Sequence, residues 1–305
     1  LFEDNAEHGL GMYLGQKVIR ESLAAKLHEL AEVTTSESKK AAIEEYFATY
    51  DDGKANTPAT EKLIAELEAD PDCKYSKEIL PKKNYLSKKS IWIFGGDGWA
   101  YDIGFGGLDH VLASGEDVNV FVFDTEVYSN TGGQASKASQ IGQVAQFAAA
   151  GKAIGKKSLS EIAMSYGYVY VAQIAMGADM NQTMKAITEA ESYHGPSLII
   201  GYAPCEMHGV KGGMTNCQAE MKKAVAAGYW NMFRFDPRKK AEGANPFSLD
   251  SKPATADYKE FISGETRYSR LKLAFPERAE ALFDLADKKA KERYEFLEKL
   301  VKLYE

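Results

Sequence analysis

Residues 95–100 form the loop Gly-Gly-Asp-Gly-Trp-Ala, which follows a short apolar run and precedes a helical stretch. Glycines let a backbone approach a ligand closely, and the start of a helix favours an anion such as a diphosphate. Asp97 would repel a phosphate unless a divalent cation lay between them, and Mg²⁺ often bridges carboxylates and phosphates. The loop therefore suggests a metal-assisted diphosphate site. The alternative interpretation is an Asp that caps a helix.

A second loop, residues 124–134, has the sequence Asp-Thr-Glu-Val-Tyr-Ser-Asn-Thr-Gly-Gly-Gln and follows the next apolar run. Thr125 lies 28 residues after Asp97. Adjacent parallel strands place the loops at their carboxyl ends side by side, so Asp97 and Thr125 can point at one ion. A Gly-Asp-Gly followed at this distance by a polar loop residue resembles the thiamine diphosphate motif. That motif usually has Asn as the second side-chain ligand, and Thr125 departs from it.

The amino-acid sequences of both loops, residues 96–110 and 124–134, closely resemble those of the pyruvate:ferredoxin (flavodoxin) oxidoreductase family. The resemblance extends from residue 1 to Tyr304 and is to the C-terminal thiamine diphosphate-binding domain of the large single-chain form. It implies conversion of pyruvate and coenzyme A to acetyl-CoA and CO₂. It also implies that electrons leave through [4Fe–4S] clusters to ferredoxin or flavodoxin, and that the remaining domains lie outside this chain.

The resemblance implies roles for individual loop residues. Asp97, Thr125 and the Val127 carbonyl would hold Mg²⁺, and Asn130 would reach the reacting centre, where its amide can bond substrate oxygens. The remaining expected contacts to thiamine diphosphate are Gly96, Gly98, Trp99, Ala100, Glu126, Tyr128, Ser129 and Thr131. The alternative, purely structural roles are that Asn130 is a turn residue and that Trp99 only packs in the core.

Cys205 follows another apolar run, in the sequence Ala-Pro-Cys-Glu at residues 203–206. A single Cys in such a place is usually a small buried apolar residue. The family resemblance instead implies that Cys205 supplies the fourth thiolate of a [4Fe–4S] cluster, whose other ligands would precede residue 1. Cys73 and Cys217 have no metal-ligand spacing, and we assign neither to a cluster.

The elements that must position these loops alternate along the chain. Apolar runs at 91–94, 118–123, 168–174 and 197–202 predict strands, and stretches at 103–113, 139–150 and 180–193 predict helices. This alternation predicts an α/β fold with a parallel sheet and helices on both faces, as the thiamine diphosphate-binding fold would have. Ligands bind such sheets at the carboxyl ends of the strands.

The regions outside this alternation are predicted to be helical. We expect helices at 12–30, 39–50 and 59–69, with breaks at Thr57-Pro58 and Asp70-Pro71. Residues 33–89 are predicted to be a polar helical insertion with too few large apolar residues for a core of its own. Residues 238–305 are predicted to be a helical extension, irregular to residue 256 and ending in a long amphipathic helix from Pro276. The whole chain is thus expected to be one domain.

Composition limits the functional class. The chain has 305 residues, 45% hydrophobic and 27% charged, with a net charge of −7 and three cysteines. Because no basic excess is present we expect no nucleic-acid partner, and because the longest uncharged run is short and polar we expect no membrane span. The cysteine count predicts a reducing, cytoplasmic setting without a disulfide framework. No signal peptide is recognised. Because the first residue is Leu1, we expect a piece of a longer or processed chain. We also expect the protein to be a homodimer.

Three functional hypotheses remain from the sequence. The first is the oxidoreductase domain, with pyruvate as the substrate. The second is another reaction on the same cofactor, such as non-oxidative decarboxylation or oxidation of a different 2-oxo acid; Cys205 argues against the decarboxylase, which needs no cluster. The third is a cofactor-binding fragment that turns nothing over, because the other cluster ligands are missing from this chain.

Overall fold

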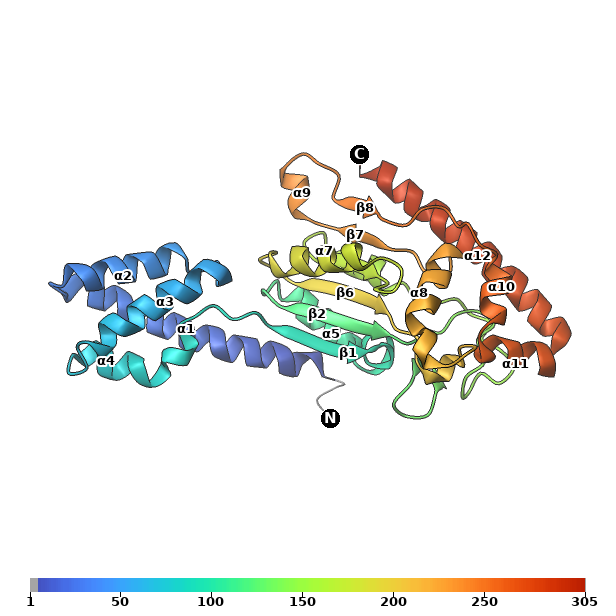
Figure 1. Cartoon of the computed structure of the whole chain (residues 1–305), viewed down its shortest axis with the longest axis horizontal. Coiled ribbons are helices and arrows are strands. Elements are labelled where there is room, and N and C mark those ends of the chain that lie inside the picture. The colour runs from blue at the N-terminus through green and yellow to red at the C-terminus, as the bar shows by residue number, and fades with distance from the viewer. Residues whose placement is uncertain (1–4, 305) are drawn as a thin grey trace. The chain divides into compact units, whose positions relative to one another are not determined.

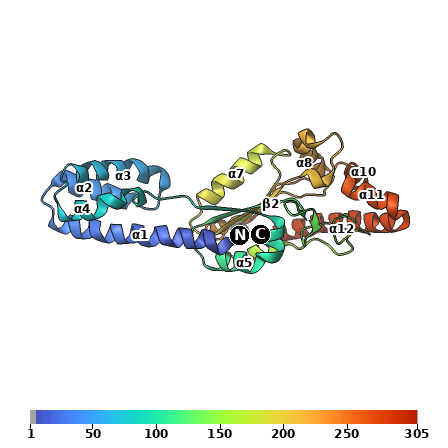
Figure 2. The same ribbon diagram turned by 90° about the horizontal axis from the view of Figure 1, so that it is seen from below.

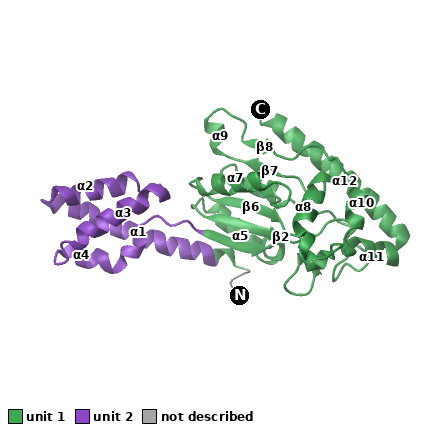
Figure 3. Cartoon of the chain, in the orientation of Figure 1, with its two compact units in different colours: residues 1–7, 92–305 green, residues 8–91 purple. Residues whose placement is uncertain are grey.

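The computed structural model describes residues 5–304. Its contacts divide the chain into two compact units (Figure 3). Unit 1 comprises residues 1–7 and 92–305, and unit 2 comprises His8–Ile91. The long helix α1 (Ala6–Val33) belongs almost wholly to unit 2.

Unit 2 is a helical body with a core of its own. Residues 33–89 were expected to carry too few large apolar residues for a core of their own. They do form a core, but only together with Leu23, Leu27 and Leu30, which α1 supplies from outside that segment. These leucines pack with fully buried side chains that include Tyr46 and Leu67. The other helices of unit 2 are α2 (Glu37–Ala48), α3 (Gly53–Glu68), α4 (Lys74–Ile79) and the 3₁₀ helix η1 (Leu80–Tyr85).

The expected break at Thr57-Pro58 is also wrong, since α3 runs through it. The helix begins earlier than its apolar pattern suggests because Asp52 caps it. The Asp52 carboxylate accepts hydrogen bonds from the backbone N–H groups of Lys54 and Ala55. The cap sets the helix start at Gly53, and Pro58 then lies in its second turn.

The centre of unit 1 is a six-stranded sheet with the order β1-β2-β6-β5-β7-β8 (Figure 1). The first four strands in this order are parallel, as predicted. The last two are antiparallel additions at one edge, which the sequence did not reveal because each has only three residues. The strands are β1 (Trp92–Gly96), β2 (Asn119–Asp124), β5 (Tyr170–Ile174), β6 (Ser197–Tyr202), β7 (Phe233–Phe235) and β8 (Phe247–Leu249).

Helices cover both faces of the sheet, which confirms the predicted α/β fold. Helices α7 (Met180–Glu191) and α5 (Phe105–Ala113) lie on opposite faces (Figure 2). The small buried residues Ala186 and Ala190 let α7 approach the sheet closely, where they pack with Tyr170 and other strand residues. Helix α6 (Leu159–Met164) and the π-helical turn η2 (Gly98–Ile103) also flank strands.

The segment 139–150 was predicted to be a helix, and this prediction is wrong. Gly142 and Phe147 both have positive φ, 81° and 66°, which a right-handed helix cannot accommodate. Some of the segment's backbone hydrogen bonds go to other segments instead: the Val144 N–H donates to the carbonyl of Arg267 at 2.8 Å. Residues 139–150 are therefore a folded loop whose shape depends on tertiary contacts.

The predicted C-terminal helix is confirmed as α12 (Pro276–Leu303). It buries Leu282, Phe283 and Leu297, among others, in unit 1. The segment 238–256, predicted to be irregular, contains both a short helix and the strand β8. The remaining helices are α8 (Cys217–Ala226), α9 (Arg238–Ala241), α10 (Tyr258–Ser263) and α11 (Thr266–Ala274), with 3₁₀ turns at Glu206–His208 (η3) and Met214–Asn216 (η4). A two-stranded ribbon pairs β3 (Val127–Tyr128) with β4 (Gln134–Ala135).

Within residues 5–304, none of the helices combines the length and the apolar character that crossing a membrane would require.

The separate core of unit 2 predicts separate unfolding. Leu67→Ala removes a fully buried side chain, and we expect it to cost unit 2 about 2–5 kcal/mol. The chain's three tryptophans all lie in unit 1, so their fluorescence reports that unit alone. The helical circular dichroism transition should therefore move while the fluorescence transition stays in place. Val18→Ala, at an exposed position of α1, is the control, and equal shifts of both signals would contradict two independent cores.

Candidate functional site

The parallel pairing of β1 with β2 brings the two predicted loops together. Gly96 pairs with Phe123 at the ends of these strands, so the residues that follow each of them emerge at the same sheet edge. The Asp97 carboxylate accepts hydrogen bonds from Thr125 at two points, at 3.1 Å from the backbone N–H and at 2.7 Å from the hydroxyl. The sequence predicted this meeting of Asp97 and Thr125.

Three oxygen atoms at this edge have the spacing of metal ligands. Asp97 Oδ1 lies 2.7 Å from Thr125 Oγ1, which in turn lies 2.9 Å from the Val127 carbonyl oxygen. Adjacent ligands of an octahedral Mg²⁺, each bound at about 2.0–2.1 Å, are separated by about 2.8–3.0 Å. The two measured separations are close to that range, so this oxygen set fits Mg²⁺.

Asp97 is 1% exposed and its second carboxylate oxygen is also engaged, by the Ser136 hydroxyl at 2.7 Å. Burial, followed by the charge of nearby Asp124, raises the pKa of Asp97 to about 7. The charge of Lys156 lowers the pKa of Asp97 to a smaller extent. A divalent cation bound here would stabilise the ionised form of Asp97.

A cavity of about 420 Å³ opens beside these oxygens. Of the residues predicted to bind the cofactor or metal, ten line this cavity, among them Asn130 at the exposed end of the second loop. The lining residues from the prediction are Gly96, Asp97, Gly98, Trp99, Thr125, Val127, Tyr128, Ser129, Asn130 and Thr131.

Two of the residues predicted to bind thiamine diphosphate, Ala100 and Glu126, do not line the cavity, and neither does Cys205, the predicted cluster ligand. Ala100 and Glu126 are fully buried. The Glu126 carboxylate forms ion pairs with Arg267 at 2.8 Å and with Lys156 at 3.3 Å, and it accepts a hydrogen bond from Tyr229. Burial raises the pKa of Glu126, but the charges of Lys156 and Arg267 outweigh that effect and lower it. The Glu126 side chain therefore belongs to the protein interior beneath the loop.

The glycines of the first loop differ in what they make room for. A Cβ on Gly98 would lie 2.5 Å from the Tyr128 ring, so Gly98 is required by protein packing. A Cβ on Gly96 would meet nothing within 4 Å, although Gly96 lines the cavity. The open space at Gly96 is where a ligand could approach the backbone.

Sequence reasoning missed an apolar part of the cavity wall. Phe94, Ile103 and Phe123 line the cavity, and their side chains are 56%, 65% and 45% exposed. The sequence could have indicated them, because all three residues lie at the ends of the predicted strands and helix that flank the two loops. A cavity with oxygen ligands at one side and apolar side chains at the other suits a molecule with a diphosphate and an aromatic ring.

Cys205 lies at the same sheet edge. Strand β6 pairs with β2, and the Ala203 N–H donates to the Asp124 carbonyl at 3.0 Å, so the chain after β6 starts beside the second loop. Cys205 is half-buried and not in a disulfide. Its sulfur accepts the backbone N–H of His208, while its own N–H donates to His208 Nδ1 at 3.1 Å. Burial raises the pKa of the Cys205 thiol.

Cys205 is not part of a complete metal site in the described part of the chain. Among residues 5–304, no group of three or more His, Cys, Asp or Glu side chains is arranged to hold a metal ion.

Comparisons with known proteins agree with this geometry. The model of the thiamine pyrophosphate enzyme C-terminal TPP binding domain matches residues 82–200, which include both loops. Pyruvate:ferredoxin oxidoreductase of Moorella thermoacetica is 54% identical over 98% of this chain. The pyruvate-flavodoxin oxidoreductases of Enterobacter agglomerans and Klebsiella pneumoniae are 52% and 49% identical over 98% and 96% of it. Over nearly its whole length the chain is homologous to one part of the pyruvate:ferredoxin and pyruvate-flavodoxin oxidoreductases.

The chain spans about a quarter of the length of these oxidoreductases, since the matches cover 25–26% of each of the three. The match to the TPP binding domain supports thiamine diphosphate as the ligand of the cavity beside Asp97. A solved 2-oxoglutarate:ferredoxin oxidoreductase from Magnetococcus marinus aligns with 72% of this chain at 19% identity and a TM-score of 0.36.

The open space at Gly96 gives a direct test of the cavity. Gly96→Ala should change the free energy of unfolding by less than about 1 kcal/mol, because its methyl group meets no protein atom. The same methyl group should weaken thiamine diphosphate binding about tenfold or more by crowding the ligand. Gly106→Ala, also with open space but away from the cavity, is the control for calorimetry. Unchanged cofactor affinity in Gly96→Ala would place the ligand elsewhere.

Proposed function

We propose that this chain is the Mg²⁺–thiamine diphosphate part of an enzyme that oxidatively decarboxylates pyruvate. With coenzyme A the products are acetyl-CoA, CO₂, one proton and two electrons. The electrons pass through [4Fe–4S] clusters to ferredoxin or flavodoxin. The observation that supports this most is the oxygen set of Asp97, Thr125 and Val127 at the edge of the cavity. The high identity to pyruvate oxidoreductases supports pyruvate as the substrate.

In this proposal Asp97, Thr125 and the Val127 carbonyl hold Mg²⁺ between the protein and the diphosphate. The backbone at Gly96 and Gly98 lies close to the diphosphate, because both glycines line the cavity. Thiamine diphosphate supplies the electron sink that decarboxylation of a 2-oxo acid requires. The protein's task is to anchor one end of the cofactor and exclude water from the buried metal side.

Asn130 is the proposed substrate-binding residue of the second loop. It lies at the cavity, next to Ser129 and Thr131, and its amide can donate to a carboxylate or carbonyl oxygen. A donor that bonds most strongly to the developing charge lowers the barrier of the chemical step. Asn130 would thus orient pyruvate, while the residues on either side of it stay with the cofactor.

Cys205 is proposed as one ligand of the [4Fe–4S] cluster nearest the thiamine. Its half-buried sulfur lies after β6, in the chain that begins beside the second loop, so a cluster there would be near the cofactor. The other ligands would come from the remaining domains. Two alternatives are oxidation of another 2-oxo acid and, for this chain alone, cofactor binding without turnover. The second is favoured by the absence of further cluster ligands within residues 5–304.

Thr125 tests the metal site. Thr125→Val keeps the side-chain shape but removes the oxygen, so we expect Mg²⁺-dependent thiamine diphosphate affinity to fall on the order of tenfold or more. Thr125→Asn should retain part of that affinity because its amide oxygen can bind the metal. Thr188→Val is the matched control, since Thr188 lies on α7 away from the cavity and its hydroxyl bonds to the Met184 carbonyl of the same helix. Calorimetry showing equal losses for Val and Asn would indicate a purely structural Thr125.

Cys205 tests the reaction itself. In the oxidoreductase assembled with its other domains, Cys205→Ala should abolish pyruvate-dependent reduction of ferredoxin and alter the electron paramagnetic resonance of one cluster. Thiamine diphosphate affinity should stay unchanged, because Asp97 and Thr125 remain in place. Cys217→Ala, at the start of α8, is the control cysteine. Normal cluster signals and normal ferredoxin reduction in Cys205→Ala would remove Cys205 from the electron path.

A further inference from the structure

The residue between two proposed metal ligands has an unusual backbone. Glu126 lies between Thr125 and Val127 and has φ of 59°, in the left-handed region that non-glycine residues adopt only at a cost. This turn of the chain lets the Val127 carbonyl oxygen come within 2.9 Å of Thr125 Oγ1. The spacing of the oxygen set therefore depends on keeping Glu126 in this conformation.

The backbone groups of Glu126 are held on both sides. Its N–H donates to Asp124 Oδ1 at 3.2 Å. Its carbonyl accepts hydrogen bonds from the Ser139 hydroxyl at 2.5 Å and from Gln143 Nε2 at 3.1 Å. The folded loop 139–150, which was predicted to be a helix, thus contributes directly to the shape of the cofactor loop.

The side chain of Glu126 is held by two cations from distant segments. Arg267, at the start of α11, donates to Oε2 at 2.8 Å. Lys156 donates to Oε1 at 3.3 Å and also to Asp124 Oδ1 at 2.8 Å. Each cation has a second carboxylate partner, because Arg267 also pairs with Glu265 at 2.6 Å. Two buried cations therefore fix the carboxylate of Glu126 from two directions.

We propose that Lys156 and Arg267 are positioning residues for the metal site: by clamping Glu126 in its left-handed conformation they hold Thr125 Oγ1 and the Val127 carbonyl at the spacing of Mg²⁺ ligands. This inference rests on the proposed function. Neither cation lines the cavity beside Asp97. Groups that orient metal ligands in this way typically change metal affinity by about 10–100-fold when removed.

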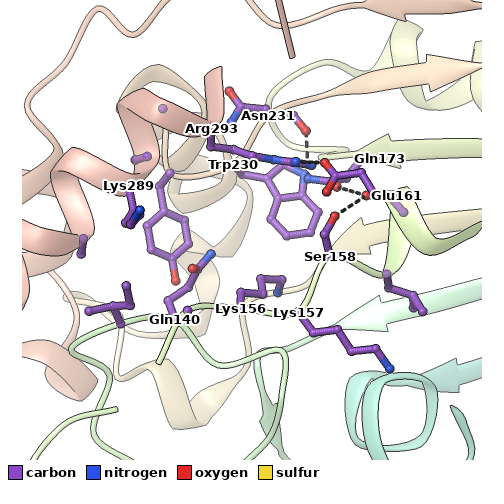
Figure 4. A pocket seen from close by; sticks show the side chains of 18 of the residues that line it. Gln140, Lys156, Lys157, Ser158, Glu161, Gln173, Trp230, Asn231, Lys289 and Arg293 are labelled. Carbon is purple, nitrogen blue, oxygen red and sulfur yellow. Dashed lines mark hydrogen bonds and ion pairs between the residues drawn. The ribbon is translucent and has the colours of Figure 1, made fainter. Parts of the chain in front are cut away.

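Lys156 can be tested without dismantling the interior because it lines a second cavity of about 460 Å³ (Figure 4). Its side chain is 16% exposed, whereas that of Arg267 is 1% exposed. Lys289 lines the same cavity, but its amine pairs with Glu292 of its own helix, α12. Lys289→Ala is thus a matched control that removes an amine from this cavity without touching the loop.

The first experiment measures Mg²⁺ affinity in the presence of thiamine diphosphate by calorimetry, in the oxidoreductase that contains this chain. Lys156→Ala should lower that affinity about 10–100-fold and Lys289→Ala should leave it unchanged. Ethylammonium, small enough to enter the cavity beside residue 156, should restore part of the loss in Lys156→Ala. Unchanged affinity in Lys156→Ala, or a loss that ethylammonium does not reduce, would overturn the proposal.

A double-mutant cycle tests the clamp itself. Glycine adopts φ of 59° without strain, so Glu126→Gly should remove the need for a clamp. The effect of Lys156→Ala on Mg²⁺ affinity should then shrink to less than about threefold in the Glu126→Gly background. An equally large effect in both backgrounds would show that Lys156 acts through Asp124 instead, and would overturn the proposal.

A measurement without cofactor separates this inference from the proposed function. Amide hydrogen exchange at residues 125–128 of the cofactor-free protein should be about tenfold faster in Lys156→Ala than in the wild type or Lys289→Ala. If the wild-type protein bound no Mg²⁺–thiamine diphosphate, the proposed function would fail, and exchange would still test the clamp. Unchanged exchange in Lys156→Ala would overturn the clamp whatever the cofactor result.

Discussion

The structure of the site depends on the in-register parallel pairing of β1 with β2. Because Gly96 is opposite Phe123, the next residues of both strands emerge together, and Asp97 meets Thr125 across a gap of 28 residues in sequence. The parallel pairing of β2 with β6 adds the chain that carries Cys205 to the same edge. A shift of one residue in either pairing would separate these groups, because successive side chains of a strand face opposite sides of the sheet.

The buried charges around this edge are out of balance. Asp97, Asp124, Glu126 and Glu265 are all buried, and the cations that pair with this group are Lys156 and Arg267. Burial raises the pKa of Glu265 and the pKa of Asp97 to about 7. A divalent cation bound beside Asp97 would reduce this excess of buried negative charge.

Sequence reasoning identified what is local and missed what is distant. Asp97 and Thr125 were predictable because glycines and polar residues after apolar runs indicate loops at the ends of strands. Glu126 was assigned to the cofactor because it lies in the loop that resembles the family motif. Its partner Arg267 is 141 residues away, and no local sequence pattern indicates that the two residues pair. Residues 139–150 have an apolar content that suits a helix, but positive φ at Gly142 and Phe147 and bonds to α11 override that preference. Unit 2 was misjudged because its core is completed by α1.

The hydroxyl of Thr125 has a single hydrogen and two acceptors within reach, Asp97 Oδ1 and the Val127 carbonyl. The hydroxyl can donate to only one of these acceptors at a time. By switching between them it keeps Asp97 Oδ1, its own oxygen and the Val127 carbonyl oxygen close together without a bound ion. Binding of a cation at the proposed metal site would require this one hydrogen to turn away. The site is therefore preorganised, and the entropy of assembling its ligands is spent during folding, so that little remains to be lost at the moment of binding.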